Sequence, residues 1–144
     1  MTATELGPGT FRWPVRVYYE DTDAGGVVYY ANYLRFMERA RTEWLRALGF
    51  EQDHVAEARG LLFVVRAATV QYRSPARFND RLEVVSRIHE HSRTSLSFAQ
   101  DIRIADQPQS MLCAATVQVV CVERSRWRPR PIPPDILAEL TVEP

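Results

Sequence analysis

The pattern of apolar and polar residues predicts one long helix. Between residues 30 and 48, apolar side chains recur at intervals of three or four, which places them on one side of a helix. Charged side chains and a threonine occupy the other side. The apolar stripe consists of Tyr33, Met37, Ala40, Trp44 and Leu48, widened by Phe36 and Leu45.

Alternation with a period of two predicts the strands. One strand is expected before the helix, four follow it, and no helical crossover separates the later ones, so the sheet is expected to be mainly antiparallel. The pattern therefore predicts an α+β fold, in which a curved five-stranded sheet wraps around one long central helix. The expected strands cover residues 12–20, 62–73, 81–91, 94–104 and 110–123, and a short second helix is expected at 51–59.

The domain organisation is simple. Residues 1–10 carry two glycines, one proline and three threonines without periodicity, and we interpret them as a flexible leader. Residues 11–144 are expected to form a single domain, because neither an internal repeat nor a second apolar pattern occurs. A chain of 144 residues is long enough to bury a substantial core.

Composition narrows the possible functions. The chain is 46% hydrophobic and carries 18 basic and 18 acidic residues, a balance that argues against nucleic acid as a partner. All the basic residues are arginine, which excludes Schiff-base catalysis and a Walker-type phosphate loop, since both need lysine. No run has the length of a transmembrane segment, and the N-terminus lacks an export signal, so a cytoplasmic location is expected.

The two cysteines are expected to be buried thiols. Cys113 and Cys121 lie eight residues apart in one predicted strand. That separation is about 26 Å at ~3.3 Å per residue, which is too far for a disulfide within one chain.

Candidate chemistry is concentrated between the first strand and the helix. Asp23 precedes Gly25 and Gly26, and this glycine turn leads to a helix N-terminus, where free backbone N–H groups and the positive end of the helix dipole lie. Glycines permit unusual backbone angles and a close approach by a ligand. A carboxylate at such a place suits acyl transfer, as a nucleophile or as a general base. On spacing alone, Asp23 could equally cap the turn or the helix.

The same stretch carries a resemblance. The run RVYYEDTDAGGVVYYANY, followed by ERARTEWL, resembles the active-site segment of hotdog-fold acyl-CoA thioesterases of the 4-hydroxybenzoyl-CoA thioesterase family. FRWPVRVYYEDTDAGGVVY is most similar to the Tol-Pal-associated branch, and the likeness extends from about residue 11 to the end. The resemblance implies a hotdog fold, hydrolysis of an acyl-CoA thioester without a cofactor or metal, and a homo-oligomer, dimer or tetramer, with its site between subunits.

The resemblance also implies roles for individual residues. Asp23 matches the catalytic aspartate, the backbone N–H of Tyr30 matches the donor that polarises the thioester carbonyl, and Gly26 belongs to the same substrate-binding motif. Arg93 and Ser95 match residues that contact the CoA phosphates, for which arginine and hydroxyl groups are suited. Tyr30 departs from the Tol-Pal branch, which typically has histidine there, so imidazole assistance is not expected.

Other interpretations of these residues were weighed. Asp21 and Asp23 form a DxD pair, but no further ligand cluster supports a metal site. His89 and His91 are expected to be surface residues at a strand end, and Glu38 is a minor catalytic candidate.

Two further function classes were weighed. One alternative is a weakly active or non-catalytic partner of acyl carrier protein or of phospholipid-synthesis enzymes, linked to the Tol-Pal envelope system. A hydratase is disfavoured, since that chemistry needs a histidine at the helix start and none precedes His54.

Overall fold

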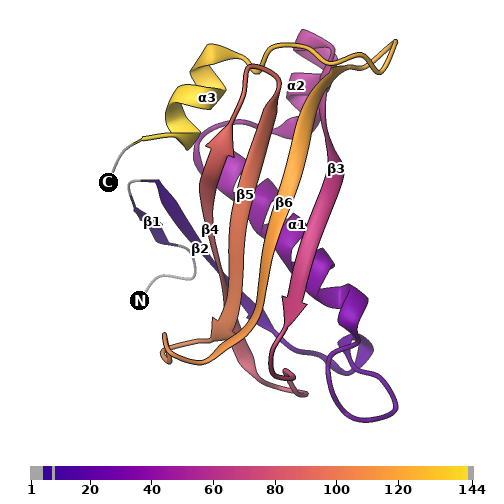
Figure 1. Ribbon diagram of the computed structural model, residues 1–144, viewed down its shortest axis with the longest axis vertical. Helices are drawn as coiled ribbons and strands as arrows, with labels where there is room; N and C mark the ends of the chain where they lie inside the picture. Colours follow the sequence, from indigo (N-terminus) through magenta and orange to yellow (C-terminus); the bar gives the residue numbers. More distant parts are fainter. Residues whose placement is uncertain (1–4, 8, 143–144) are drawn as a thin grey trace.

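The computed structural model describes residues 5–7 and 9–142 (Figure 1). Strands and helices follow one another in the order that the sequence predicts, with short elements added. Along the chain they are β1 (Glu5–Gly7), β2 (Thr10–Arg16), a 3₁₀ turn (Tyr19–Asp21), α1 (Tyr30–Ala47), α2 (Gln52–Arg59), β3 (Leu61–Tyr72), β4 (Arg81–His91), β5 (Ser95–Ile104), β6 (Met111–Glu123) and α3 (Pro134–Leu140).

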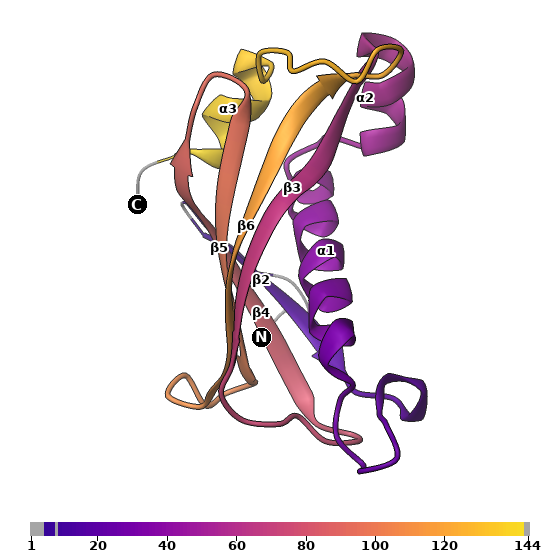
Figure 2. The same cartoon turned by 45° about the vertical axis from the view of Figure 1, so that its right-hand side comes forward.

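The strands form one antiparallel sheet. In the described part of the chain the strand order is β1-β2-β4-β5-β6-β3, so β3 lies at one edge and β1 at the other. Helix α1 runs along one face of this curved sheet, and α2 and α3 lie near one end of it (Figure 2). The α+β class and the sheet wrapped around a single long helix are confirmed. The three-residue β1 adds a sixth strand to the predicted five.

The core lies between α1 and the sheet. The predicted stripe is buried from Tyr33 to Leu45, and Leu48 packs at its margin. Trp44 is the largest buried side chain; its ring stacks on Phe11 of β2 at 6.2 Å and meets Phe98 of β5 edge to face at 5.9 Å. Burying one such side chain contributes roughly 2–3 kcal/mol. Helix α1 is therefore held in place from both halves of the sheet.

The first strand ends earlier than predicted. It stops at Arg16, and the segment up to residue 20 leaves the sheet. The Tyr18 N–H donates to Asp21 Oδ2 at 2.8 Å, and the Asp21 N–H donates to the Tyr18 carbonyl at 3.0 Å. A carboxylate that binds the backbone ahead of it favours a turn over a strand, so the alternating pattern was overridden locally.

The predicted leader is only partly covered by the structure. Residues 1–4 and 8 lie outside the described residues, whereas Glu5–Gly7 pairs with β2 as a short strand. The division into a leader and a domain over 11–144 stays a prediction.

Candidate active site

The loop that carries Asp23 is closed by its own backbone. The Asp23 N–H donates to the Val27 carbonyl at 2.9 Å, and the Tyr29 N–H donates to the Asp21 carbonyl at 2.9 Å. Gly26 has a φ of +80°, which favours glycine, and its N–H donates to the Asp23 carbonyl at 3.0 Å. These bonds return the chain directly from Asp23 to the start of α1.

Side chains and neighbouring backbone hold this loop in position. The Val28 N–H donates to the Ala76 carbonyl at 2.8 Å, and the Ala76 N–H donates to the hydroxyl of buried Tyr33 at 3.0 Å. The Asn32 side-chain amide donates to the Asp21 carbonyl at 2.9 Å. The loop is thereby fixed both to α1 and to the segment that follows β3.

The Asp23 carboxylate is exposed and oriented. Its Oδ1 accepts a hydrogen bond of 2.8 Å from the Gly25 N–H. Part of the capping interpretation is therefore correct, since Asp23 does bind within its own turn. One hydrogen bond leaves most of the lone-pair sites of a carboxylate available, so this contact orients the group without occupying it.

The N-terminus of α1 is open. Tyr29 is the N-cap residue, its side chain makes no capping hydrogen bond, and the first turn contains no acidic residue. Among the described residues, no group accepts a hydrogen bond from the Tyr30 N–H. A free N–H at the positive end of an 18-residue helix is a donor for developing negative charge.

An aromatic cluster surrounds this N-terminus. The Tyr72 hydroxyl donates to the Tyr30 carbonyl at 3.2 Å, and the Tyr72 ring meets the rings of Tyr30 and Tyr33 edge to face at 6.1 and 5.5 Å. Tyr29 lies 4.8 Å from Tyr30, ring to ring. Tyr30, Tyr33 and Tyr72 line a shallow depression of about 260 Å³.

The phenols around the helix start act as hydrogen-bonding groups rather than bases. Burial raises the pKa of Tyr72 above its usual value, and the hydrogen bond with Tyr30 raises the pKa of Tyr29. Both groups therefore stay protonated at neutral pH. The sequence did not single out Tyr72, since it lies 42 residues from Tyr30 at the end of an ordinary alternating strand.

The two predicted CoA contacts, Arg93 and Ser95, lie in the β4–β5 turn and at the start of β5. This turn is at the end of the sheet opposite to the loop that carries Asp23 (Figure 1). Ser95 pairs with Val120 of β6, which in turn pairs with Val64 of β3, whereas Tyr72 at the far end of β3 touches Tyr30. The eight residues from Val64 to Tyr72 span about 26 Å at ~3.3 Å per residue. Within one chain, Asp23, Gly26 and Tyr30 therefore lie together, whereas Arg93 and Ser95 lie far from them.

Within that turn, both residues have structural tasks. The Ser95 hydroxyl is buried and lies 2.7 Å from the Ser92 hydroxyl. The Arg93 carbonyl accepts a hydrogen bond from the Ile132 N–H at 2.9 Å, while the Arg93 side chain is exposed. Arg93 is therefore free to reach a ligand, whereas Ser95 would first have to break its bond to Ser92.

No metal site is formed in the described part of the chain. No group of three His, Cys, Asp or Glu side chains there could hold an ion. Asp21 binds the Tyr18 backbone, as its position near the turn predicts, and His89 and His91 are exposed at the end of β4. Over the described residues, no helix combines the length and apolar character needed to cross a membrane.

An antiparallel sheet around one long helix, with an acidic loop closed onto the helix N-terminus, defines a thioesterase-like domain. A family model of the thioesterase-like superfamily matches residues 17–140, and the chain belongs to this superfamily. The predicted family and its hotdog fold are confirmed.

Similar proteins agree with this assignment. The acyl-CoA thioester hydrolase YbgC of Escherichia coli O6:H1 is 52% identical over 90% of this chain and 94% of its own. The acyl-CoA thioesterase YbgC of Haemophilus influenzae is 44% identical over 89% and 92%. Among solved structures, a 1,4-dihydroxy-2-naphthoyl-CoA thioesterase from Synechocystis superposes with a TM-score of 0.85 at 25% identity, covering 92% and 96% of the two chains.

Proposed function

We propose that this protein hydrolyses an acyl-CoA thioester to a free acid and CoA. One observation carries the proposal: the exposed Asp23 carboxylate lies on a loop that backbone hydrogen bonds close onto the open N-terminus of α1. The relatives named acyl-CoA thioester hydrolase, at 52% identity over most of their length, support the same reaction.

In the proposed mechanism, the thioester carbonyl oxygen binds the Tyr30 N–H. Asp23 then attacks the carbonyl carbon directly, or removes a proton from an attacking water. In either case negative charge develops on the carbonyl oxygen, the carbon–sulfur bond breaks, and CoA leaves as a thiolate that is then protonated. When Asp23 is the nucleophile, this step leaves a mixed anhydride between Asp23 and the acyl group, and water then hydrolyses the anhydride to the free acid and the Asp23 carboxylate. A single preorganised oxyanion donor is typically worth about 10²–10³ in rate. Both groups act where the loop already holds them.

The three histidines do not favour imidazole assistance. His54 lies on α2, and His89 and His91 lie on β4 near the β4–β5 turn, at the end of the sheet opposite to the Asp23 loop. Within one chain, the proposal therefore assigns proton transfer to the carboxylate, with tyrosine hydroxyls as hydrogen-bonding neighbours.

We also propose a homo-oligomer built on the β3 edge. Residues 65–69 of β3 are exposed along the free edge, and Val65 is 53% exposed. Unpaired backbone on an apolar edge strand is a template for pairing with another chain. An antiparallel pair of β3 strands would set the Tyr72 end of one copy beside the Leu61 end of the other. A dimer of such dimers would form the expected tetramer.

In this assembly the β4–β5 turn of one copy comes to the same end of the joined sheet as the Asp23 loop of the other. That supports Arg93 as a contact to the CoA phosphates across the subunit boundary. We propose Ser95 as the second contact to CoA, which requires its hydroxyl to break the hydrogen bond with Ser92. Gly26 is assigned to the loop surface that the pantetheine chain approaches.

We further propose a cytoplasmic location and a link to the Tol-Pal system or to acyl carrier protein. The link to acyl carrier protein is one outcome of the test below. A protein that binds acyl carrier protein tightly but hydrolyses no acyl-CoA of any chain length would support the partner role instead.

The proposal is tested by replacing Asp23 with asparagine. Asp23→Asn preserves the side-chain shape and the bond from the Gly25 N–H, so the protein should fold normally and lose at least 100-fold in kcat. Thiol release is measured over a panel of acyl-CoAs. Glu20→Gln is the matched control, an exposed carboxylate in the same segment that should leave turnover unchanged. Wild-type turnover in Asp23→Asn would end the assignment.

A further inference from the structure

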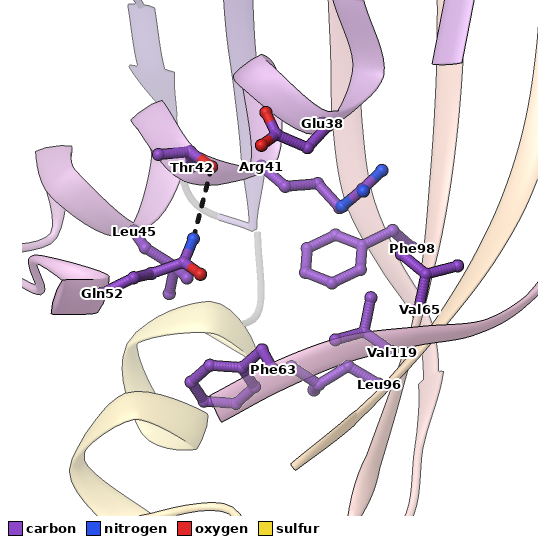
Figure 3. Close-up of a pocket in the computed structure, with 10 residues that line it drawn as sticks. All are labelled: Glu38, Arg41, Thr42, Leu45, Gln52, Phe63, Val65, Leu96, Phe98 and Val119. Carbon is purple, nitrogen blue, oxygen red and sulfur yellow. Dashed lines mark hydrogen bonds between the residues drawn. The ribbon is translucent and has the colours of Figure 1, made fainter. Parts of the chain in front are cut away.

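A cavity lies between the middle of α1, α2 and the sheet (Figure 3). It has a volume of about 120 Å³, and its lining includes Phe63 and Val65 of the edge strand β3. Its apolar wall comes from β3, β5, β6 and α1, and its polar groups come from the two helices. The apolar residues are Leu45, Phe63, Val65, Leu96, Phe98 and Val119, and the polar ones are Glu38, Arg41, Thr42 and Gln52.

Arg41 is held in this wall by a buried amide. Its Nη1 donates to Gln100 Oε1 at 2.9 Å, and its guanidinium carbon lies 6.0 Å from the centre of the Phe98 ring. Gln100 is fully buried, and its Nε2 donates to the Met37 carbonyl at 3.0 Å and to the Ser86 hydroxyl at 2.9 Å. Because both amide hydrogens of Gln100 are used, its Oε1 faces Arg41 and accepts the hydrogen bond from Nη1.

In the part of the chain that the structure describes, the charge of Arg41 is not matched. No carboxylate of the described residues lies within ion-pair distance of it. Figure 3 shows the guanidinium extending over Phe98, while the Glu38 carboxylate points to the other side of the Arg41 side chain. Burial lowers the pKa of Arg41, and Glu38 opposes this shift, but an arginine remains charged. A partly buried cation with unused N–H donors favours an anionic ligand.

The proposed dimer sets this cavity beside the reacting carbonyl of the partner copy. Along one helix, Arg41 lies eleven residues from Tyr30, which is about 16 Å at 1.5 Å per residue. Antiparallel β3 pairing brings the Tyr72 end of one copy, with its Tyr30, beside the Leu61 end of the other, whose Phe63 and Val65 line the cavity. In such a pair, an acyl chain held at Tyr30 of one copy would lie at the same end of the joined sheet as the Arg41 cavity of the other.

We propose that Arg41 binds a carboxylate at the far end of the acyl group, so that this protein prefers ω-carboxyacyl thioesters to neutral acyl thioesters of equal length. This inference rests on the proposed thioesterase function. The apolar wall takes the methylene chain, and the guanidinium pairs with the terminal carboxylate. Arg41 is thus a specificity-determining residue and has no part in the bond-breaking step.

The experiment compares kcat/KM for glutaryl-CoA with valeryl-CoA, and for adipyl-CoA with hexanoyl-CoA. The wild-type protein should prefer the carboxylated member of at least one pair by tenfold or more. Arg41→Gln should lower kcat/KM for that substrate by about 10- to 100-fold, the usual loss for a hydrogen-bonded charge, and leave the neutral substrate within about threefold. Arg39→Gln, an exposed arginine on the same helix, is the matched control.

A binding measurement separates this inference from the proposed function. Calorimetric titration of Asp23→Asn with glutaryl-CoA and valeryl-CoA should show tighter binding of the former, and the difference should vanish in Asp23→Asn/Arg41→Gln. That result would support the inference even if the wild-type protein hydrolysed neither substrate. Equal affinities, or an Arg41→Gln variant that loses both substrates equally or changes its oligomeric mass, would overturn it.

Discussion

At the scale of single residues, the site depends on what each polar group is already bound to. Asp23 uses one oxygen in its own turn and keeps the rest of the carboxylate exposed. Arg41 uses one donor on Gln100 and keeps the others. In contrast, Asp21 and Ser95 are occupied within the fold. Residue type alone does not distinguish the available side chains from the occupied ones, because availability depends on the hydrogen bonds that each side chain already makes.

The buried thiols make a prediction about pH. Both cysteines are free and buried, as expected from their spacing. Burial, assisted by the charge of Asp101, raises the pKa of Cys113 from an ordinary value near 9 to about 11. A group with a raised folded-state pKa contributes stability that is present below its unfolded pKa and lost as the pH rises through its folded pKa. Folding stability should therefore fall by about 2 kcal/mol between pH 9 and 11 because of Cys113.

Urea unfolding at several pH values measures this effect. Cys113→Ala should be less stable at pH 8, because it leaves a small cavity, but should lose less stability between pH 9 and 11 than the wild-type protein. Other titratable groups are common to both proteins, so the difference between the two proteins is the informative quantity. Parallel pH profiles would contradict the assignment to Cys113.

At the scale of secondary-structure elements, the loop before α1 depends on one glycine with an unusual φ. Gly26 at +80° and Gly60 at +66° both adopt left-handed angles, and an added Cβ would meet no atom within 4 Å at either position. Gly26→Ala and Gly60→Ala should therefore each cost about 1 kcal/mol of stability through backbone strain alone. Only Gly26→Ala should also lower kcat, by roughly tenfold, because it displaces the Asp23 loop.

The pair of variants separates strain from function. Gly60 ends α2, at the end of the sheet opposite to the Asp23 loop, so Gly60→Ala reports the cost of strain without a change at the site. Unfolding free energies and kcat are measured for both proteins. An equal fall in kcat, or none in either, would mean that the loop conformation does not control turnover.

Most elements followed from periodicity, and the exceptions have local causes. Helix α1, α2 and the four strands after them lie within one or two residues of their predicted bounds, because long amphipathic patterns dominate local preferences. The first strand was cut short because a single carboxylate, Asp21, captured the backbone of Tyr18. A side-chain contact of this kind leaves no periodic signal.

The candidate site was only partly predictable for a related reason. Asp23, Gly26 and Tyr30 lie within eight residues of one another, so a single sequence motif identified all three. Tyr72 reaches Tyr30 across 42 residues, and Gln100 reaches Arg41 across 59. Contacts of that range depend on strand order and register, which the chain reveals only when folded.

At the scale of the whole molecule, the proposed site is shared between two copies of the chain. Its acidic loop lies at one end of β3 and its Arg41 cavity near the other. An antiparallel pairing of two β3 edges would cover the exposed backbone of this strand. It would also bring the Asp23 loop of one copy to the Arg41 cavity of the other. A substitution that prevents β3 pairing should therefore abolish both oligomerisation and turnover.

Ala67 provides the test of this coupling. It is exposed near the middle of β3, so a two-fold antiparallel pair sets it close to its own copy. In Ala67→Glu, two carboxylates would face each other, and like charges in that position destabilise strand pairing. The wild-type protein should have a mass in light scattering of at least twice the 16.6 kDa of one chain. Ala67→Glu should approach the mass of one chain and lose at least tenfold in kcat/KM, while Ala67→Ser keeps both. A monomeric Ala67→Glu with full turnover would show that one chain suffices, and the shared site would have to be abandoned.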